Sequence, residues 1–247
     1  MLQPLISIIT PNFNSEKFIS ETIKSVINQS YQNWELIIVD DFSTDNSLNI
    51  IEKFRTKDSR ICLIKLSKNS GPAITRNKAI KVAKGDYLAF LDSDDSWFTN
   101  KLEKQLNFME QKDIAFSFTS YYSFDENKND RKLIKAKEFI SYNNLLTNNY
   151  IGCLTVMYSV KHLGKVYFPL VKKRQDWALW LKITKNSILA YGIQEPLANY
   201  TRRNESVSSN KLNLLKYNWL VYRKFEKINI FRAIFLMSIL LSKKILK

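Results

Sequence analysis

Hydrophobic and polar positions alternate with two different periods up to residue 91, and the two periods predict two kinds of element. Short β-branched and apolar runs predict four buried strands, at residues 5–10, 34–40, 61–66 and 87–91. Between these runs, apolar residues recur every three or four positions, which predicts helices at residues 18–27, 48–54 and 73–83. This alternation predicts an α/β fold with a mostly parallel sheet and helices on both of its faces.

Residues at the expected helix ends agree with this alternation. Asn14 or Ser15 is placed to cap the first helix and Ser43 or Thr44 the second, because short polar side chains accept hydrogen bonds from free N–H groups there. Gly85 follows the third helix at a position expected for a C-cap.

The pattern is less regular after residue 91. It predicts helices at residues 99–112, 138–147 and 176–185, strands at 114–119, 153–158 and 188–193, and long helical stretches after residue 209. The charged, Asn-rich run at 125–132 is typical of a solvated loop.

Composition excludes several classes of protein. The 247 residues, 45% of them apolar, are sufficient for a large hydrophobic core. A single histidine and two distant cysteines, Cys62 and Cys153, cannot form the usual zinc cluster, a disulfide scaffold or a histidine-based triad. Five glycines cannot form the dinucleotide fingerprint or the P-loop at any point in this chain. Cys62 falls in a predicted buried strand, where we expect it to pack in the core.

Charge points to an anionic partner. Lys and Arg number 38 against 23 Asp and Glu, a net charge of +15, so the chain is expected to bind nucleic acid, a membrane surface or a phosphorylated ligand. The chain does not open with a basic stretch and a long apolar run, and no window approaches the roughly 18 apolar residues that span a bilayer. We therefore expect a cytoplasmic protein.

Acidic residues gather directly after two of the predicted strands. Asp40 and Asp41 end or follow the second, and Asp92, Asp94 and Asp95 follow the fourth. Ligands of an open parallel sheet bind beyond the carboxyl ends of its strands. Crowded carboxylates repel one another, and Mg²⁺ or Mn²⁺, held by one or two carboxylates and by substrate phosphates, would relieve that repulsion. The alternative is that these acids only cap helices.

Four sequence segments, in this order, resemble the motifs of family 2 glycosyltransferases. They are Ser-Ile-Ile-Thr-Pro-Asn-Phe-Asn at 7–14, Glu-Leu-Ile-Ile-Val-Asp-Asp-Phe-Ser-Thr-Asp at 35–45, Gly-Pro-Ala-Ile-Thr-Arg-Asn at 71–77 and Phe-Leu-Asp-Ser-Asp-Asp-Ser-Trp at 90–97. The resemblance covers residues 5–106 strongly and 176–209 moderately. It implies a Rossmann-like GT-A fold and transfer of a sugar from a nucleotide donor, commonly a UDP-sugar, with inversion at the anomeric carbon.

The resemblance also implies how the chain is divided. A catalytic domain would occupy residues 1–208, with a nucleotide-sugar-binding half at 1–112 and an acceptor-binding half at 113–208. A basic, amphipathic helical tail would follow at 209–247.

Donor-binding residues follow from the matched motifs. The resemblance places Pro11 and Phe13 beside the nucleoside, with Phe where the family more often has Tyr, and places Asp41 to accept a hydrogen bond from the uracil N3–H. Arg76 matches an arginine that approaches the donor diphosphate or sugar. The structural alternatives are a helix-entry acid for Asp41 and an exposed helical cation for Arg76.

The Asp-Ser-Asp-Asp segment matches the Asp-X-Asp motif of the family. By that match Asp94 is the metal ligand, for Mn²⁺ or Mg²⁺, and Asp92 contacts ribose or sugar hydroxyls. Asp95 is a further possible donor-site residue.

The catalytic base is expected to be a carboxylate. Asp176 falls on the base position of a Glu-Asp motif, with Gln175 replacing the usual Glu. The alternative is an N-cap of a helix beginning at Trp177. Residues 200–208 resemble a later family segment whose usual His is absent, and Arg203 stands near that position as a possible contact for the diphosphate.

The last fifth of the chain is basic and amphipathic. Residues 202–247 hold eleven Lys or Arg against Glu205 and Glu226. An apolar stripe with flanking cations predicts an interfacial helix on anionic lipid, and it comprises Phe231, Ile234, Phe235, Ser238, Ile239 and Ile245. The alternative is a helix packed on the catalytic domain. The first reading makes the protein peripheral on the inner face of the plasma membrane.

Amino-acid usage bears on the biological role. Scarce Gly with abundant Lys, Asn and Ile favours a bacterium with an AT-rich genome, in which enzymes of this family commonly build lipopolysaccharide, O-antigen or capsule. The acceptor would then be a saccharide, lipid-linked in such pathways. Two other functions stay open: a catalytically inactive nucleotide-sugar-binding relative, and a basic nucleic-acid-binding protein.

Overall fold

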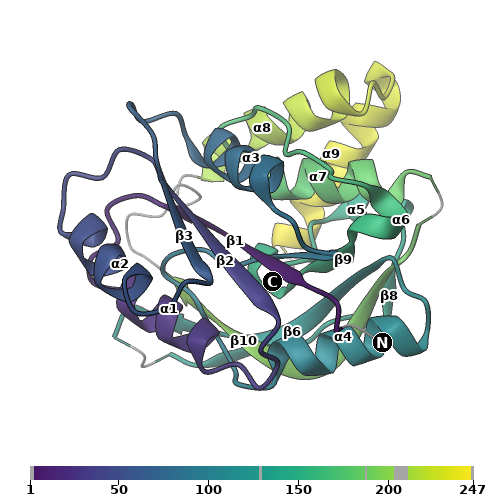
Figure 1. The fold of residues 1–247 in the computed structure, drawn as a ribbon. Helices are drawn as coiled ribbons and strands as arrows, with labels where there is room; N and C mark the ends of the chain where they lie inside the picture. Colours follow the sequence, from purple (N-terminus) through teal and green to yellow (C-terminus); the bar gives the residue numbers. More distant parts are fainter. Residues whose placement is uncertain (1–2, 128–129, 187, 203–210, 246–247) are drawn as a thin grey trace.

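A single mixed β-sheet forms the centre of the molecule (Figure 1). The computed structural model describes residues 3–127, 130–186, 188–202 and 211–245. Its strands are β1 (Ile6–Asn12), β2 (Trp34–Asp40), β3 (Ile61–Lys65), β4 (Tyr87–Phe90), β5 (Ser96–Trp97), β6 (Phe116–Asp125), β7 (Lys132–Ile134), β8 (Phe139–Ile140), β9 (Met157–Ser159) and β10 (Ala190–Arg202). They are ordered β3-β2-β1-β4-β9-β6-β10-β5, with β7 paired to β6 and β8 to β10.

The parallel half of the sheet carries the motifs at 7–14 and 35–45 and leads into the motif at 90–97. β3, β2, β1 and β4 pair in parallel, so their carboxyl ends meet at one edge. β9 then runs antiparallel to both β4 and β6, and this restores the original direction in β6 and its parallel neighbour β10. The mostly parallel α/β sheet expected from the sequence is confirmed.

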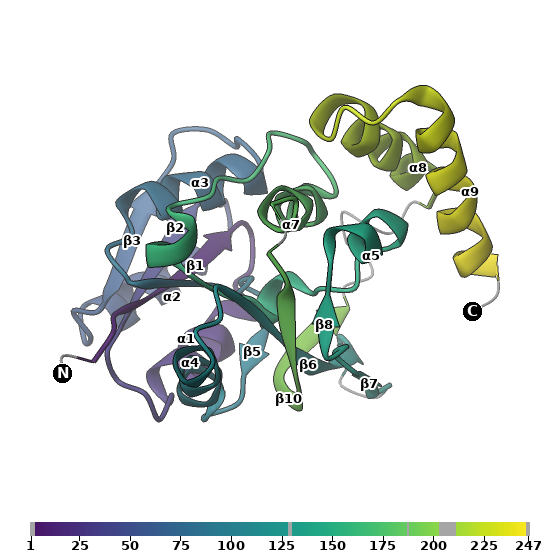
Figure 2. The same ribbon diagram turned by 90° about the vertical axis from the view of Figure 1, so that its right-hand side faces the viewer.

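Helices cover both faces of the sheet. They are α1 (Ile19–Ile27), α2 (Ser47–Arg55), α3 (Pro72–Val82), α4 (Lys101–Gln111), α5 (Tyr142–Thr147), α6 (Val160–Leu163), α7 (Gln175–Thr184), α8 (Lys211–Leu220) and α9 (Ile230–Ile245). Figure 2 shows α3 and α7 on one side of the sheet and α1 and α4 on the other.

Alternation along the strands builds two cores. Ile8 of β1 and Ile38 of β2 pack in the core on the α1 and α4 side, whereas Ile9 and Ile37 pack in the core beneath α3 and α7. All four side chains are buried. A strand buried on both faces reads as a continuous apolar run, which is why the sequence identified β1 and β2 so clearly.

Three elements of the second half differ from expectation. The helix predicted at 138–147 begins only at Tyr142, because Phe139–Ile140 pairs with β10 and Ser141 then caps α5 in a capping box. The strand predicted at 153–158 is a 3₁₀ turn, Cys153–Thr155, followed by β9. The strand predicted at 188–193 extends to Arg202 through two irregularities in its pairing with β6.

The expected caps are wrong for α1, α2 and α3. α1 begins after Phe18 and α2 after Asn46, neither with a side-chain cap, and α3 ends at Val82 with Ala83 as its C-cap. Gly85 has another role, because a Cβ there would lie 2.6 Å from the backbone nitrogen of Ser7. Its missing side chain lets the segment before β4 approach β1.

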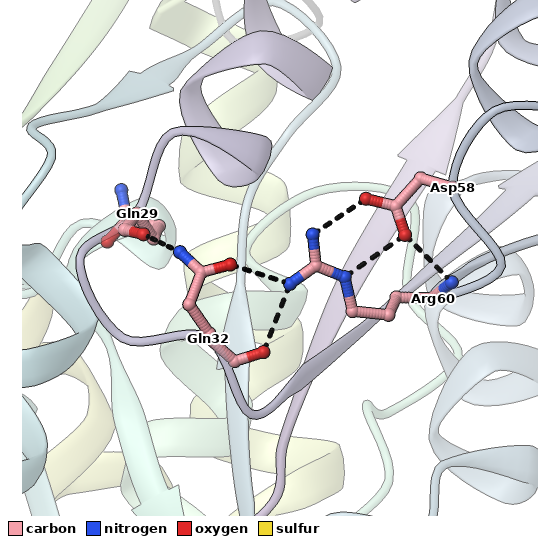
Figure 3. Close-up of polar contacts among 4 residues, drawn as sticks. All are labelled: Gln29, Gln32, Asp58 and Arg60. Carbon is pink, nitrogen blue, oxygen red and sulfur yellow. Dashed lines mark hydrogen bonds and ion pairs between the residues drawn. The ribbon is translucent and has the colours of Figure 1, made fainter.

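Cys62 is exposed, contrary to the expected core position. β3 lies at the sheet edge, where Ile61 is buried but Cys62 and Lys65 are exposed. Close by, Arg60 donates to both oxygens of Asp58 and to the carbonyl and side-chain oxygens of Gln32, whose amide nitrogen donates to the carbonyl of Gln29 (Figure 3). These bonds join the loops that enter β2 and β3, at the end of the sheet opposite Asp40.

The C-terminal helices pack on the rest of the chain through one face. Ala233, Leu236 and Leu240 of α9 are buried in the same core as α5 and α7. A π-helical turn, Val221–Phe225, connects α8 toward α9. Within the described part of the chain, no helix has the length and apolar character required to span a membrane.

Lys101 is a fully buried amine at the start of α4. Its Nζ lies 3.7 Å from the ring centroid of Trp97, and it has no hydrogen-bond partner among the described residues. Burial lowers the pKa of Lys101 well below its ordinary value, because the charged amine has lost its hydration.

We expect Lys101→Met to raise the free energy of unfolding by about 1 to 3 kcal/mol at pH 7. Because the unfolded chain binds this proton more tightly than the folded protein, wild-type stability should rise as pH increases toward 10, and the advantage of the variant should shrink. Thermal unfolding at pH 7, 8.5 and 10 measures the difference. A variant less stable at every pH would mean that the contact with Trp97 outweighs the loss of hydration.

Candidate active site

Asp40 joins the ends of β1 and β2 to the loop that follows β2. Its carboxylate accepts hydrogen bonds from the amide nitrogen of Asn12, at 2.6 Å, and from the backbone N–H of Ser43, at 2.9 Å. Asp40 is 1% exposed, so both of these bonds are shielded from water. The first acid of the Val-Asp-Asp motif is therefore a structural anchor.

Asp41 holds the loop that leads into α3. Its two carboxylate oxygens accept from the backbone N–H groups of Ser70, at 2.7 Å, and Gly71, at 2.8 Å. Gly71 has φ 87°, a conformation open to glycine without the strain that a Cβ introduces. Asp41 thus fixes the segment that begins α3 and positions Arg76 further along that helix.

Two exposed phenylalanines stand beside this anchor. Phe13, after β1, is 44% exposed, and Phe42, directly after Asp41, is 52% exposed and has φ 68°. A left-handed conformation in a residue other than glycine is strained, and such strain is concentrated at functional sites. Pro11 lies just before, partly buried within β1. Phe13 and Pro11 were predicted from the sequence as donor-binding residues, whereas Phe42 was not.

Arg76 and Asp92 form a buried ion pair across the site. Nη2 of Arg76 donates to Oδ1 of Asp92, and the two side chains are 8% and 30% exposed. Arg76 is therefore not an exposed helical cation. Burial opposes its charge, but the fields of Asp92 and Asp176, with the Asp92 hydrogen bond, raise the pKa of Arg76. Its Nε is buried and has no hydrogen-bond partner among the described residues.

The next two acids differ in their surroundings. Asp95 is 2% exposed and accepts from the backbone N–H of Thr201 at 2.9 Å. Its Oδ2 is buried and has no partner within the part of the chain that the structure describes. Burial, followed by the nearby charges of Asp94 and Asp92, raises the pKa of Asp95 well above its ordinary value. Asp94 is partly buried and, with Asp95, lines a cavity of about 90 Å³ between α1 and the end of β6.

Asp176 lies in the first turn of α7, on the same side of the sheet as Arg76. α7 begins at Gln175, so Asp176 is inside the helix and the predicted alternative of an N-cap is wrong. Its Oδ2 accepts from Nδ2 of Asn149 at 2.9 Å, and Oδ1 of Asn149 accepts from the backbone N–H of Ile151 at 3.2 Å. The amide of Asn149 is therefore held in place and orients the Asp176 carboxylate.

Tyr121 and Tyr200 lie within the electrostatic field of the acidic residues. Their rings lie 6.2 Å apart, on neighbouring strands β6 and β10. Burial, followed by the charge of Asp95, raises the pKa of each phenol, and Asp176 adds to the effect at Tyr121. Both tyrosines therefore share one electrostatic environment with the acids, and both stay protonated near neutral pH.

Sequence reasoning missed Asn149 and Tyr121. Tyr121 follows the predicted strand at 114–119, so the same rule that selected Asp92 could have found it. Asn149 lies in a loop without a motif, and only its contact with Asp176 identifies it. Arg203 lies outside the described residues.

The residues present fit a divalent cation only in combination with a substrate. No three acidic, histidine or cysteine side chains in the described segments are arranged to hold a metal by themselves. Asp94 and the unpartnered oxygen of Asp95 nevertheless supply the oxygen ligands that Mg²⁺ and Mn²⁺ favour. Donor phosphates would have to complete the coordination.

Comparison with known proteins identifies the class. Residues 7–166 match the family model "Glycosyl transferase family 2". A putative teichuronic acid biosynthesis glycosyltransferase, TuaG of Bacillus subtilis, is 45% identical over 94% of this chain and 92% of its own length. The chain belongs to family 2 of the glycosyltransferases and is a glycosyltransferase.

A second relative has a more specific name. The Escherichia coli protein WfgD, "UDP-Glc:alpha-D-GlcNAc-diphosphoundecaprenol beta-1,3-glucosyltransferase", is 41% identical over 95% of this chain and 91% of its own length. Both relatives are bacterial; the name of TuaG refers to teichuronic acid biosynthesis, and that of WfgD to a UDP-Glc donor and a GlcNAc-diphosphoundecaprenol acceptor.

Solved structures confirm the GT-A fold. Staphylococcus aureus TarS 1-349 in complex with UDP-GlcNAc superposes with a TM-score of 0.73 at 23% identity, over 96% of this chain and 71% of that one. The mannosyltransferase PcManGT of Pyrobaculum calidifontis, in complex with GDP-Man and Mn²⁺, has a TM-score of 0.61 at 15% identity, over 91% and 63%.

We expect Asp41→Ala to release the Ser70 and Gly71 amides. Loss of a buried carboxylate acceptor should lower the free energy of unfolding by about 1 to 3 kcal/mol. Hydrogen exchange in a peptide covering residues 66–76 should accelerate at least tenfold, while Asp41→Asn, which keeps one acceptor oxygen, should show a smaller change. Unchanged exchange in Asp41→Ala would show that Asp41 does not hold this loop.

Proposed function

We propose that this glycosyltransferase moves a sugar from a UDP-sugar to a lipid-linked saccharide, with inversion at the anomeric carbon, in assembly of a bacterial surface polysaccharide. The observation that carries the proposal is the grouping of the Arg76–Asp92 pair, Asp94 and Asp176 at one edge of the sheet. The names of WfgD and the TarS complexes support the donor class, and that of WfgD supports the lipid-linked acceptor.

The donor would lie across the carboxyl ends of β1, β2 and β4. Phe13 offers an exposed aromatic face to the base, beside Pro11, and Asp41 can accept the uracil N3–H with its remaining lone pairs. Arg76 would direct its free Nε toward the diphosphate or sugar. Asp92, held by Arg76 and still 30% exposed, can accept from ribose or sugar hydroxyls.

Asp94 would hold Mn²⁺ or Mg²⁺, with Asp95 as a second oxygen donor nearby. A bound divalent cation would neutralise the diphosphate leaving group and replace the glycine cradle that this sequence lacks. Arg203 stays a proposed diphosphate contact.

Asp176 would take the proton from the acceptor hydroxyl as its oxygen attacks the sugar on the face opposite the departing nucleotide. The amide of Asn149 occupies one carboxylate oxygen and leaves the other to receive that proton. The acceptor would then enter from the side of α5 and α7, consistent with the proposed acceptor-binding half, residues 113–208, of a catalytic domain at 1–208.

We expect Asp94→Ala to fold normally and to lose metal-dependent transfer by more than a hundredfold. Calorimetric titration of Mn²⁺ into the protein with UDP should show no binding, because the carboxylate ligand is gone. Asp125→Asn removes another carboxylate that lines the same cavity and serves as the matched control. Near-normal turnover of Asp94→Ala in Mn²⁺ buffer after chelator treatment would refute the assignment.

We expect Asp176→Asn to lower kcat by about 10² to 10⁴ while UDP affinity changes little, because a general base acts only in the chemical step. Asn149→Ala keeps the carboxylate but removes its donor, and should lower kcat by roughly 10- to 100-fold, the equivalent of a hydrogen bond to a charged group. Equal losses in UDP binding and turnover would instead indicate that the two residues are structural. Single-turnover transfer and UDP titration separate the two outcomes.

A further inference from the structure

Helix α9 exposes a row of large apolar side chains. Phe231 is 81% exposed, Phe235 63% and Ile234 55%, and Ile230 and Leu241 are 47% and 41% exposed. Positions three and four residues apart share one face of a helix, so these residues form a single stripe, which we call the outer face of α9. Exposed apolar patches of this kind mark sites of interaction.

The outer face is not simply the unpacked side of a loose helix. Ala233, Leu236 and Leu240 form the opposite face and are 0%, 5% and 6% exposed. α9 is therefore already docked on the domain through one apolar face, and a second apolar face remains. The alternative expected for the tail, a helix packed on the domain, therefore describes one face of α9, while Phe231, Ile234 and Phe235 of the predicted stripe stay exposed. Binding of that stripe to lipid stays a prediction.

The segment around the outer face is strongly basic. Residues 211–245 contain eight Lys or Arg and one acid, Glu226. Glu226 is buried and accepts from Lys185 at 3.1 Å and from Tyr142 at 2.7 Å. Lys224 and Lys227, which precede α9, and Arg232, within it, are exposed. The surface therefore combines apolar side chains with uncompensated positive charge.

We propose that the outer face of α9 binds the surface of an anionic lipid bilayer. A protein partner would account for the apolar stripe, but the surrounding positive charge fits the negative potential of an acidic leaflet. The 16 residues of α9 extend only about 24 Å, less than the roughly 30 Å hydrocarbon thickness, so the helix would lie in the interface plane. Its phenylalanines would enter the acyl boundary while the cations contact headgroups.

This orientation would place the acceptor side of the site near the membrane. α9 packs on α5, and α5 packs on α7, which carries Asp176. Both views show α9 at the periphery of the molecule with α8, on the side of α5 and α7 (Figures 1 and 2). The link to a lipid-linked acceptor rests on the proposed function, whereas bilayer binding itself does not.

Co-sedimentation of the full-length chain with vesicles tests the proposal without donor or acceptor. We expect binding to vesicles of phosphatidylcholine with 30% phosphatidylglycerol, and at least tenfold weaker binding to phosphatidylcholine alone. Raising salt from 0.1 to 0.5 M should weaken binding at least threefold, because charges are then screened. Equal binding to both vesicle types, or none to either, would overturn the proposal.

Phe231→Ser with Phe235→Ser should weaken binding at least tenfold, and Phe231→Ser alone should act in the same direction. Phe139→Ser is the matched control, since Phe139 is also a largely exposed phenylalanine, at 52%, but belongs to β8 and not to α9. Circular dichroism verifies that each variant folds. Because Phe231 is 81% exposed, the single variant should fold even if the double variant does not, and it then tests the proposal alone. Undiminished binding of a folded Phe231→Ser variant would also overturn the proposal.

Two further readouts separate alternative explanations. Light scattering measures the mass of the wild type in solution, and a dimer that dissociates in the double variant without loss of vesicle binding would show that the outer face joins two copies. Transfer to a water-soluble acceptor analogue should be unchanged in the double variant. If the double variant kept vesicle binding but lost this activity, the outer face would not be the surface that binds the bilayer. It would instead contribute to the transfer reaction.

Discussion

The buried contact between Arg76 and Asp92 is the interaction on which the site depends. Carboxylates follow β2 and β4 at one edge of the sheet, and without compensation their mutual repulsion would oppose the parallel pairing that brings the strands together. Arg76 places a guanidinium among them, from α3. A buried charge of this kind is stable only when paired, so α3 and the loop after β4 constrain each other.

The aspartates at this edge separate into two groups by what their oxygens contact. Asp40, Asp41 and Asp95 accept backbone N–H groups of Ser43, of Ser70 and Gly71, and of Thr201. They hold loops. Asp92 and Asp176 are held by side chains, Arg76 and Asn149, and remain partly accessible. The first group thus fixes the loops around the site, and the second is left accessible to a ligand. Asp41 and Asp95 hold loops and can also contact the ligand.

The C-terminal helices are also fixed by hydrogen bonds to elements of the site. Glu226 receives Tyr142 from α5 and Lys185 from the end of α7, so the turn before α9 is fixed to the same two elements that form the Asp176 side of the site. α9 accordingly belongs to the core through Ala233, Leu236 and Leu240, and still leaves a second face uncovered. The same helix therefore packs on the domain and presents an exposed apolar face.

Local sequence determined the parallel half of the sheet, because strands buried on both faces read as unbroken apolar runs and their polar ends mark where ligands bind. Asp92 and Asp94 could be selected in this way, whereas Asp176 was found by its resemblance to a family motif. Tertiary structure decided what depends on neighbours distant in sequence: the exposure of Cys62 at a sheet edge, the strand at Phe139–Ile140 that pairs with β10, and the contact of Asn149 with Asp176. The same holds for α9, whose sequence is apolar on two faces. Periodicity identifies such faces, but only packing determines which one the protein covers.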